Sequence, residues 1–248
     1  MKLSIKNLSI GYSGKTVLKD LNLQAQSGDF IVLLGKNGAG KSTLIKSLAG
    51  IIPLIKGKIL INEDSLSGFT GKKRAKFTGV VLTDKIDLNL KVYEFIGLGR
   101  QVYTGHFDNL TAIDKQVIEK VIDKLDLSDF IYHNLQELSD GERQKILIAR
   151  VLVQETPIIL LDEPTVHLDL ENKAMIFKLL KELAIKENKI IILSTHDLNL
   201  ILPVVDKIWL VNQHHISEMN HKSKDIIKLF ASSPHIRFDE DCGIYKLD

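Results

Sequence analysis

The residues best suited to chemistry form a glycine-rich stretch between an apolar run and an expected helix. The stretch matches G-x-x-x-x-G-K-[ST] and consists of Gly35, Lys36, Asn37, Gly38, Ala39, Gly40, Lys41 and Ser42. Glycines let backbone N–H groups close around phosphate oxygens, and the following helix N-terminus adds positive potential. Lys41 would contact the β- and γ-phosphates, and the Ser42 hydroxyl would ligate Mg²⁺. A glycine turn with an incidental lysine is the alternative, and the strand–loop–helix context favours a phosphate loop.

Two carboxylates follow a second apolar run. The four residues 158–161 are apolar and lead directly into Asp162 and Glu163. Ligands of open α/β folds bind at the C-terminal edge of parallel strands, which is where these side chains are expected. Asp162 is placed to hold the Mg²⁺ shell, and Glu163 to take a proton from attacking water. A solvated acidic turn is the alternative, and the phosphate loop elsewhere in the chain disfavours it.

Composition excludes several classes of protein. The chain has 248 residues, of which 44% are hydrophobic and 26% charged, a profile typical of a soluble globular protein with a large core. A net charge of +2 argues against a general nucleic-acid binder. Cys242 is the single cysteine, which favours a reducing cytoplasm. No apolar run reaches the ~18 residues of a spanning helix, and the N-terminus does not resemble a signal peptide.

Hydrophobic periodicity predicts the elements that position these residues. Alternation from Leu3 to Ile10 and from Leu21 to Ala25 predicts two strands, and the continuous run 30–34 predicts a strand buried on both faces. A helix is expected from Gly40 to about Leu48. Further strands are expected at 59–61, 79–82, 158–161 and 190–193, with a helix at 171–186.

Between residues 91 and 154 the apolar spacing becomes helical. One face is expected from Val92, Phe95, Ile96 and Leu98, and another from Ile113, Val117, Val121, Ile122 and Leu125. The pattern predicts a single domain over 1–248, a βαβ core interrupted by a helical insert. The expected parts are a core with a β subdomain at about 1–84 and 155–220, an insert at about 85–154, and a C-terminal helix and tail at about 221–248.

A third motif lies between the insert and the acidic strand end. Leu138 precedes Ser139, Asp140, Gly141 and Glu142, which open an apolar-periodic helix. A serine N-cap is the ordinary interpretation of this pattern, and a second anion site is the functional one. With the order phosphate loop, helical insert, this motif and acidic strand end, the chain resembles the ATPase subunit of an ABC transporter, whose signature motif reads Leu-Ser-Gly-Gly-Gln.

The resemblance implies an α/β fold. Its parts are a P-loop NTPase core with a mixed sheet and flanking helices, an antiparallel β subdomain and a helical insert subdomain. The nucleotide contacts that it adds are an adenine-stacking Tyr12, together with Val17, Thr43 and the D-loop Asp169. A half-buried strand tyrosine is the alternative for Tyr12. The resemblance also places His196 at the γ-phosphate, beside the catalytic Glu163.

Two positions depart from the family pattern. Asp140 replaces one glycine of the usual Gly-Gly pair, so its side chain must point away from an anion. The family's lid glutamine is missing, and Thr83 stands in its place after the strand at 79–82. We hypothesise that Thr83 reaches the metal through a bridging water.

The resemblance further implies partners and a location. Leu98-Gly99-Arg100 and Tyr103-Thr104-Gly105 are similar to ATPases of importers for iron-siderophore complexes, haem and cobalamin. The resemblance implies a head-to-tail homodimer that binds ATP and Mg²⁺. It also implies a permease docked on residues 83–105, which would connect the chain indirectly to a periplasmic or lipoprotein substrate-binding protein. The chain would lie peripherally on the cytoplasmic face of the bacterial inner membrane, with no nucleic-acid partner. The alternatives are a soluble ABC-type ATPase of Fe–S assembly or nucleic-acid maintenance, and a non-catalytic regulatory nucleotide binder.

Overall fold

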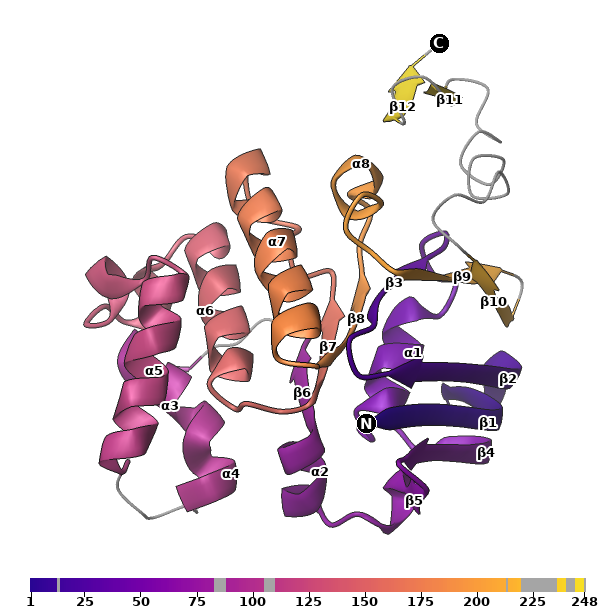
Figure 1. The fold of residues 1–248 in the computed structure, drawn as a ribbon, viewed down its shortest axis with the longest axis horizontal. Helices are drawn as coiled ribbons and strands as arrows, with labels where there is room; N and C mark the ends of the chain where they lie inside the picture. The colour runs from indigo at the N-terminus through magenta and orange to yellow at the C-terminus, as the bar shows by residue number, and fades with distance from the viewer. Residues whose placement is uncertain are drawn as a thin grey trace.

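The strand β3 (Phe30–Leu34) lies within a six-stranded sheet whose order is β10-β9-β3-β8-β7-β6 (Figure 1). The computed structural model describes residues 1–12, 14–82, 88–104, 110–212 and 214–219, and the backbones of two further strands. Five strands of the sheet are parallel, and β10 is antiparallel to β9. The other strands of this sheet are β6 (Thr78–Val81), β7 (Ile158–Asp162), β8 (Ile190–Ser194), β9 (Lys207–Asn212) and β10 (His215–Met219).

A second sheet is antiparallel and has the order β2-β1-β4-β5. Its strands are β1 (Lys2–Tyr12), β2 (Lys15–Gln26), β4 (Leu54–Ile61) and β5 (Asp64–Ser65). Alternating burial along β2 reflects its one packed face and one solvated face. The helix α1 (Lys41–Leu48) shares a buried core with this sheet and with one face of the six-stranded sheet.

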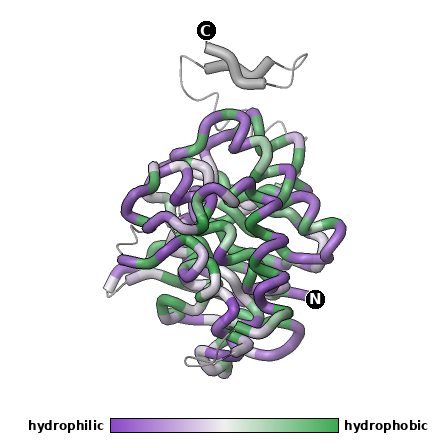
Figure 2. The backbone as a smooth tube through the Cα atoms, turned by 90° about the vertical axis from the view of Figure 1, so that its left-hand side faces the viewer, coloured by the Kyte–Doolittle hydropathy of each residue, from purple (hydrophilic) through white to green (hydrophobic). Residues whose placement is uncertain are grey.

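The opposite face of the six-stranded sheet packs against the other large helices. They are α3 (Val92–Gly97), α5 (Ala112–Lys124), α6 (Asp140–Leu152) and α7 (Leu170–Lys186). Along β3, Phe30 and Val32 join the core of these helices, while Ile31 and Leu33 join the core of α1. The alternation of a strand between its two faces therefore separates α1 from α6 by the thickness of the sheet. Hydrophilic and hydrophobic stretches alternate along the backbone (Figure 2).

Short elements complete the described chain. They are η1 (Leu66–Gly68), α2 (Gly71–Phe77), η2 (Leu98–Arg100), α4 (Gln101–Thr104), η3 (Ser128–Phe130), η4 (Leu135–Glu137), α8 (Leu198–Ile201), β11 (Ile236–Asp239) and β12 (Ile244–Leu247). The strands β11 and β12 pair with each other, where the sequence predicted only an extended end. The short helix expected after residue 221 lies outside the described residues. In the described part of the chain, no helix is long and apolar enough to cross a membrane.

The predicted fold class is confirmed, and on α5 and its C-cap the predicted apolar face is correct for Val121, Ile122 and Leu125 but wrong for one residue. The mixed sheet, the antiparallel sheet and the flanking helices are all present. On α5, however, Ile113 is 68% exposed, whereas Ile118 and Ile122 are buried. The buried stripe of α5 begins at Asp114, one position later than predicted. The periodicity of apolar residues did not show this, because Asp114 is polar and periodicity alone cannot place a buried carboxylate.

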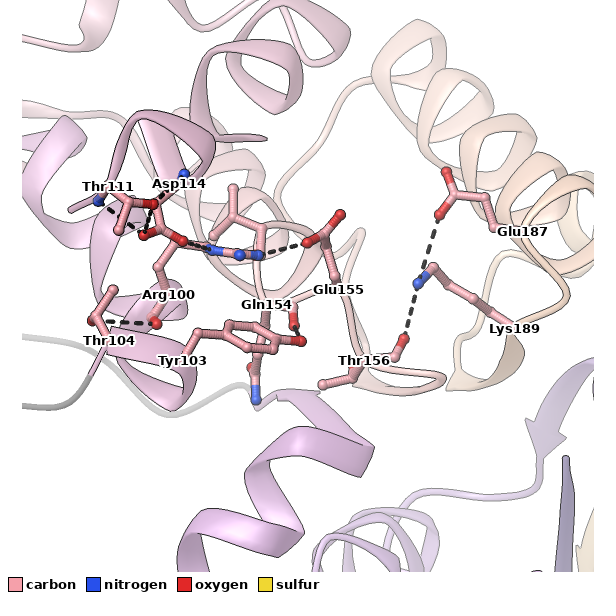
Figure 3. A network of polar contacts seen from close by, with 11 residues as sticks. Arg100, Tyr103, Thr104, Thr111, Asp114, Gln154, Glu155, Thr156, Glu187 and Lys189 are labelled. Atoms are coloured by element: carbon pink, nitrogen blue, oxygen red, sulfur yellow. Dashed lines mark hydrogen bonds and ion pairs between the residues drawn. The ribbon is translucent and has the colours of Figure 1, made fainter. Parts of the chain in front are cut away.

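That buried carboxylate is part of a joint between the helices and the sheet (Figure 3). Arg100 is itself buried, and its Nε donates to Asp114 Oδ1 over 2.8 Å. Its Nη1 donates to Glu155 Oε2 over 2.7 Å and to the Val153 carbonyl over 2.8 Å. The guanidinium also lies over the Tyr103 ring, 4.3 Å from its centroid. One side chain thus connects η2, α5 and the segment that leads into β7.

Removal of Arg100 is expected to destabilise the fold severely. Arg100→Ala leaves the Asp114 carboxylate buried and unpaired, which costs about 3–5 kcal/mol of unfolding free energy. Urea unfolding at pH 7 measures this loss. The matched control is Glu155→Ala, which removes the half-exposed partner and should cost less than about 1 kcal/mol. A loss below about 1 kcal/mol in Arg100→Ala would contradict the structural role.

The same joint predicts a dependence on pH. Hydrogen bonds from Thr111, with a further contribution from the Arg100 guanidinium, lower the pKa of Asp114. A carboxyl with a lowered pKa in the folded state stabilises the fold above its unfolded pKa of about 4. The contribution is lost as the pH falls through the lowered pKa. The difference between wild type and Arg100→Ala should therefore shrink on acidification.

Candidate nucleotide-binding site

The phosphate loop connects the end of β3 to the start of α1. All three of its glycines, Gly35, Gly38 and Gly40, have positive φ, and that of Gly40 is +109°. A Cβ added at Gly40 would lie 2.8 Å from Val17 Cγ1, so the loop needs glycine there for backbone conformation and for space. The predicted loop residues Lys36, Asn37 and Gly38 are exposed, and Ala39 is partly exposed. The loop therefore presents backbone to solvent just before the N-terminus of α1.

The side chain of Lys41 turns back onto this loop. Its Nζ donates to the Gly35 carbonyl over 2.9 Å and to the Lys36 carbonyl over 3.3 Å. Burial lowers the pKa of Lys41, while the nearby charges of Glu163 and Asp162 raise it. The phosphate loop and the acidic strand end, 121 positions apart in the sequence (Lys41 to Asp162), thus meet at one edge of the sheet.

Other predicted residues surround Lys41. Ser42, which follows it, is exposed, and Thr43 is buried in the first turn of α1. Tyr12, at the end of β1, is 52% exposed. Val17 is partly buried, and its carbonyl accepts a 2.7 Å hydrogen bond from His214 Nδ1.

The two carboxylate oxygens of Asp162, at the end of β7, lie in different environments. Its Oδ1 accepts a 2.7 Å hydrogen bond from Ser194 Oγ. Its Oδ2 is buried and, among the described residues, has no hydrogen-bond partner. A buried carboxylate oxygen without a hydrogen-bond partner calls for a ligand, and carboxylate and hydroxyl oxygens are the donors that Mg²⁺ prefers. The donor set formed by Asp162 and Ser42 therefore fits a magnesium ion.

Glu163 and His196 lie side by side at the ends of the neighbouring strands β7 and β8. His196 Nε2 is 3.1 Å from Glu163 Oε1, and both side chains reach solvent. Glu163 has a left-handed backbone with φ +49°, and its N–H contacts both Oγ and O of Ser194 at 3.0 and 3.1 Å. A strained backbone held by its neighbours is typical of functional sites. The arrangement can hold a water molecule beside a carboxylate base.

A second polar cluster fixes the loops that carry these two residues. Asp197 Oδ2 accepts from Thr165 Oγ1 over 2.9 Å, and Asp197 Oδ1 accepts from Lys173 Nζ over 2.8 Å. The cluster ties the loop after β7 to the loop after β8. Sequence reasoning missed it, and the signal that could have found it is the position of Asp197, directly after His196.

The signature motif forms the N-terminus of α6. Ser139 is its N-cap: Ser139 Oγ accepts from the Glu142 N–H over 3.3 Å, and Glu142 Oε2 accepts from the Ser139 N–H over 2.8 Å. Hydrogen bonds from Ser139 lower the pKa of Glu142. The Asp140 side chain is exposed and pairs with Arg143 over 3.2 Å.

The D-loop packs against this motif in the same chain. A Cβ added at Gly141 would lie 3.1 Å from the His167 carbonyl. Asp169 Oδ1 accepts from the Asn172 N–H over 2.8 Å and so caps α7. The structure thus brings the signature motif and the D-loop together, but on the opposite face of the sheet from α1. Thr83 lies outside the described residues.

Comparisons with known proteins agree with this arrangement. The family model described as ABC transporter matches residues 18–166. An uncharacterised ABC transporter ATP-binding protein of Methanocaldococcus jannaschii is 34% identical over 99% of this chain and 86% of its own length. The iron(3+)-hydroxamate import ATP-binding protein of Bacillus subtilis is 32% identical over 79% of this chain and 74% of its own length.

A solved structure extends the agreement to the fold. It is the dimeric, post-hydrolysis state of an ATP-binding cassette bound to ADP and phosphate, with a TM-score of 0.79 and 26% identity. The match covers 89% of this chain and 99% of that one. With a phosphate loop, an acidic strand end and a signature motif in the places described above, the chain belongs to the ABC transporter family and is an ATP-binding, ATP-hydrolysing subunit.

Proposed function

We propose that the chain powers a bacterial importer that takes up an iron complex, such as a siderophore or haem, or cobalamin. The observation that supports ATP hydrolysis is that four residues lie close together at one edge of the sheet, namely Lys41, Asp162, Glu163 and His196. The import part is supported by the relative that imports iron(3+)-hydroxamate. The motif at 98–100 supports the same subfamily.

Each residue of the site has a proposed role. The backbone of residues 35–42 and the Lys41 ammonium hold the β- and γ-phosphates, with Tyr12 stacked on adenine. Ser42 and Asp162 are the proposed magnesium ligands, with Thr83 acting through water. Bound Mg²⁺ would neutralise charge developing on the phosphates. Glu163 takes the proton from the attacking water, and His196 orients its carboxylate and faces the γ-phosphate.

The second half of each site is proposed to come from another copy of the chain. Within one chain, α1 and α6 pack on opposite faces of the sheet, so the phosphate loop and Ser139 belong to different surfaces. A two-fold, head-to-tail pair would place residues 139–142 of one copy on the nucleotide held by the other. Because the pair is symmetric, its formation completes two nucleotide sites at once. The solved relative described above is likewise a dimer.

The proposed membrane partner is a permease that docks on the helical insert. It would hold the chain at the cytoplasmic face of the membrane and connect it indirectly to a substrate-binding protein. Coupling follows if closure of the two copies moves the docked permease helices. The single domain with the boundaries given above is part of the same proposal.

Co-expression tests the importer assignment. Expressed alone, the chain should remain in the supernatant after ultracentrifugation; expressed with the permease encoded beside it, the chain should move to the membrane fraction. Membrane vesicles containing both should then take up ferric hydroxamate only with ATP. The control is Lys41→Ala, which should still move to membranes and support no uptake. A chain that stays in the supernatant with every neighbouring permease would favour the soluble ATPase instead.

A further inference from the structure

The end of β9 and the start of β10 lie between the phosphate loop and β2. Since β9 is parallel to β3 and pairs with it up to Leu34, it ends at the same sheet edge as the phosphate loop begins. A Cβ added at Gly35 would lie 2.7 Å from the carbonyl oxygen of Val211, so the end of β9 contacts the loop directly. The strand β10 lies beside β2 of the other sheet (Figure 1). The β9–β10 pair therefore bridges the two sheets next to the phosphate loop.

His214, directly before β10, holds β2 through both its side chain and its backbone. Its Nδ1 lies 2.7 Å from the Val17 carbonyl oxygen, and because a carbonyl only accepts, Nδ1 carries the hydrogen. The His214 carbonyl in turn accepts from the Lys19 N–H over 2.9 Å. The backbone of His214 has a φ of +71°, a left-handed conformation that a residue with a Cβ adopts at a cost. A residue held in such a conformation by specific contacts is a candidate for a functional role.

Val17, which receives this hydrogen bond, is an additional residue in β2. The pairing of β2 with β1 shifts by one residue between Thr16 and Leu18, so Val17 forms a β-bulge. Bulges redirect side chains and are common beside active sites. The Val17 side chain lies against the phosphate loop, since a Cβ added at Gly40 would be 2.8 Å from Val17 Cγ1. His214 therefore supports the backbone of β2 where its regular pairing is interrupted.

Tyr12 lies near the same end of the antiparallel sheet. It ends β1 and pairs with Lys15, which begins β2 two positions before Val17. We call Tyr12 and Val17 the base wall, because both are expected to contact the nucleotide, with adenine on Tyr12. His214 contacts this wall, and Val211, on the preceding strand, contacts the phosphate loop. The hydrogen bond from His214 thus connects the base wall to the strand that supports the phosphate loop.

We propose that His214 is a positioning residue for the adenine side of the nucleotide site. By holding the Val17 carbonyl, it orders the base wall before ATP arrives, so that ATP binding does not have to supply the cost of ordering. Glu163 and His196 lie at the ends of β7 and β8, so the effect falls on the affinity for ATP and not on the chemical step. The inference rests on the proposed function, which places adenine on Tyr12.

His214→Gly separates positioning from folding. Glycine adopts the left-handed backbone without strain and keeps the carbonyl that accepts from Lys19, but it removes the imidazole donor. The KM for ATP should rise about 3- to 10-fold, the range expected for one lost hydrogen bond, while kcat and Tm stay close to those of wild type. In calorimetry, the Kd of ATP should rise by the same factor. The Kd of inorganic triphosphate, which has no base, should not change.

His214→Asn should restore the wild-type affinity for ATP. Asparagine tolerates a left-handed backbone, and its Nδ2 offers a donor where the imidazole has Nδ1. The matched control is His215→Ala, which removes the neighbouring exposed imidazole and should leave the KM unchanged. Trp209, the single tryptophan, is buried in β9, so its fluorescence in each variant reports whether that strand keeps its packing.

Each outcome decides for or against the role of His214. ATP affinity that stays at the wild-type value in His214→Gly would overturn the inference, as would weak ATP binding by His214→Asn. An equal loss of affinity for ATP and triphosphate would make His214 a support of the phosphate loop instead, and a Tm several degrees lower in His214→Gly would make it a structural residue. If Tyr12→Ala binds ATP as tightly as wild type, the proposed adenine contact fails and this inference fails with it.

Discussion

Lys41→Ala is expected to reduce ATP hydrolysis by at least about 100-fold and to weaken ATP binding about 10- to 100-fold. Lys41 is the buried cation of the phosphate loop, and each charge-assisted hydrogen bond to a phosphate contributes about 1.5–3 kcal/mol. In the nucleotide-free chain its Nζ hydrogen-bonds the carbonyls of Gly35 and Lys36, so it is already aligned with the loop.

The measurement is the rate of phosphate release together with ATP titration by calorimetry. The matched control is Lys58→Ala, which removes an exposed lysine of β4 and should leave both quantities unchanged. A circular dichroism spectrum like that of wild type would show that Lys41→Ala is folded. Wild-type turnover in a folded Lys41→Ala protein would remove Lys41 from the site.

Glu163→Gln should separate binding from chemistry. Glutamine keeps the shape of the side chain and a hydrogen bond to His196, but it cannot take a proton from water. Loss of a general base typically costs about 10²- to 10⁴-fold in rate. ATP affinity should be preserved, because the phosphate loop and Asp162 are unchanged.

Single-turnover hydrolysis with excess protein measures this step directly. Thr70→Ala is a useful comparison, because it removes the N-cap of α2, away from the site, and should lower stability by about 1 kcal/mol without eliminating the chemical step. Rapid turnover by Glu163→Gln would transfer the role of the base to another residue.

The sequence was sufficient for the parts of the site that are local. The strands that carry the phosphate loop and Asp162 are continuous apolar runs, and β3 and β7 begin where their patterns predicted. A glycine-rich loop after a buried strand has few alternative structures, so Lys41 and Ser42 could be placed from the motif alone. The Ser139 N-cap followed from the residue type and from Glu142 three positions later.

The rest of the fold and of the site depends on contacts between residues that are distant in the sequence. The strand β9 was not predicted, although it pairs with β3 and contains the buried Trp209. The buried Arg100–Asp114 pair was invisible because charged residues are ordinarily expected at the surface. Periodicity reports which face is apolar, and it cannot report which buried charges find partners.

The central claim is that two copies of this chain enclose ATP between the phosphate loop of one and Ser139 of the other. The most direct test is gel filtration of Glu163→Gln with and without ATP and Mg²⁺, with the mass determined by light scattering. The account predicts a monomer without nucleotide and a stable dimer with ATP, while wild type elutes mainly as a monomer in both cases. A Glu163→Gln protein that binds ATP and remains a monomer at every concentration would contradict the account.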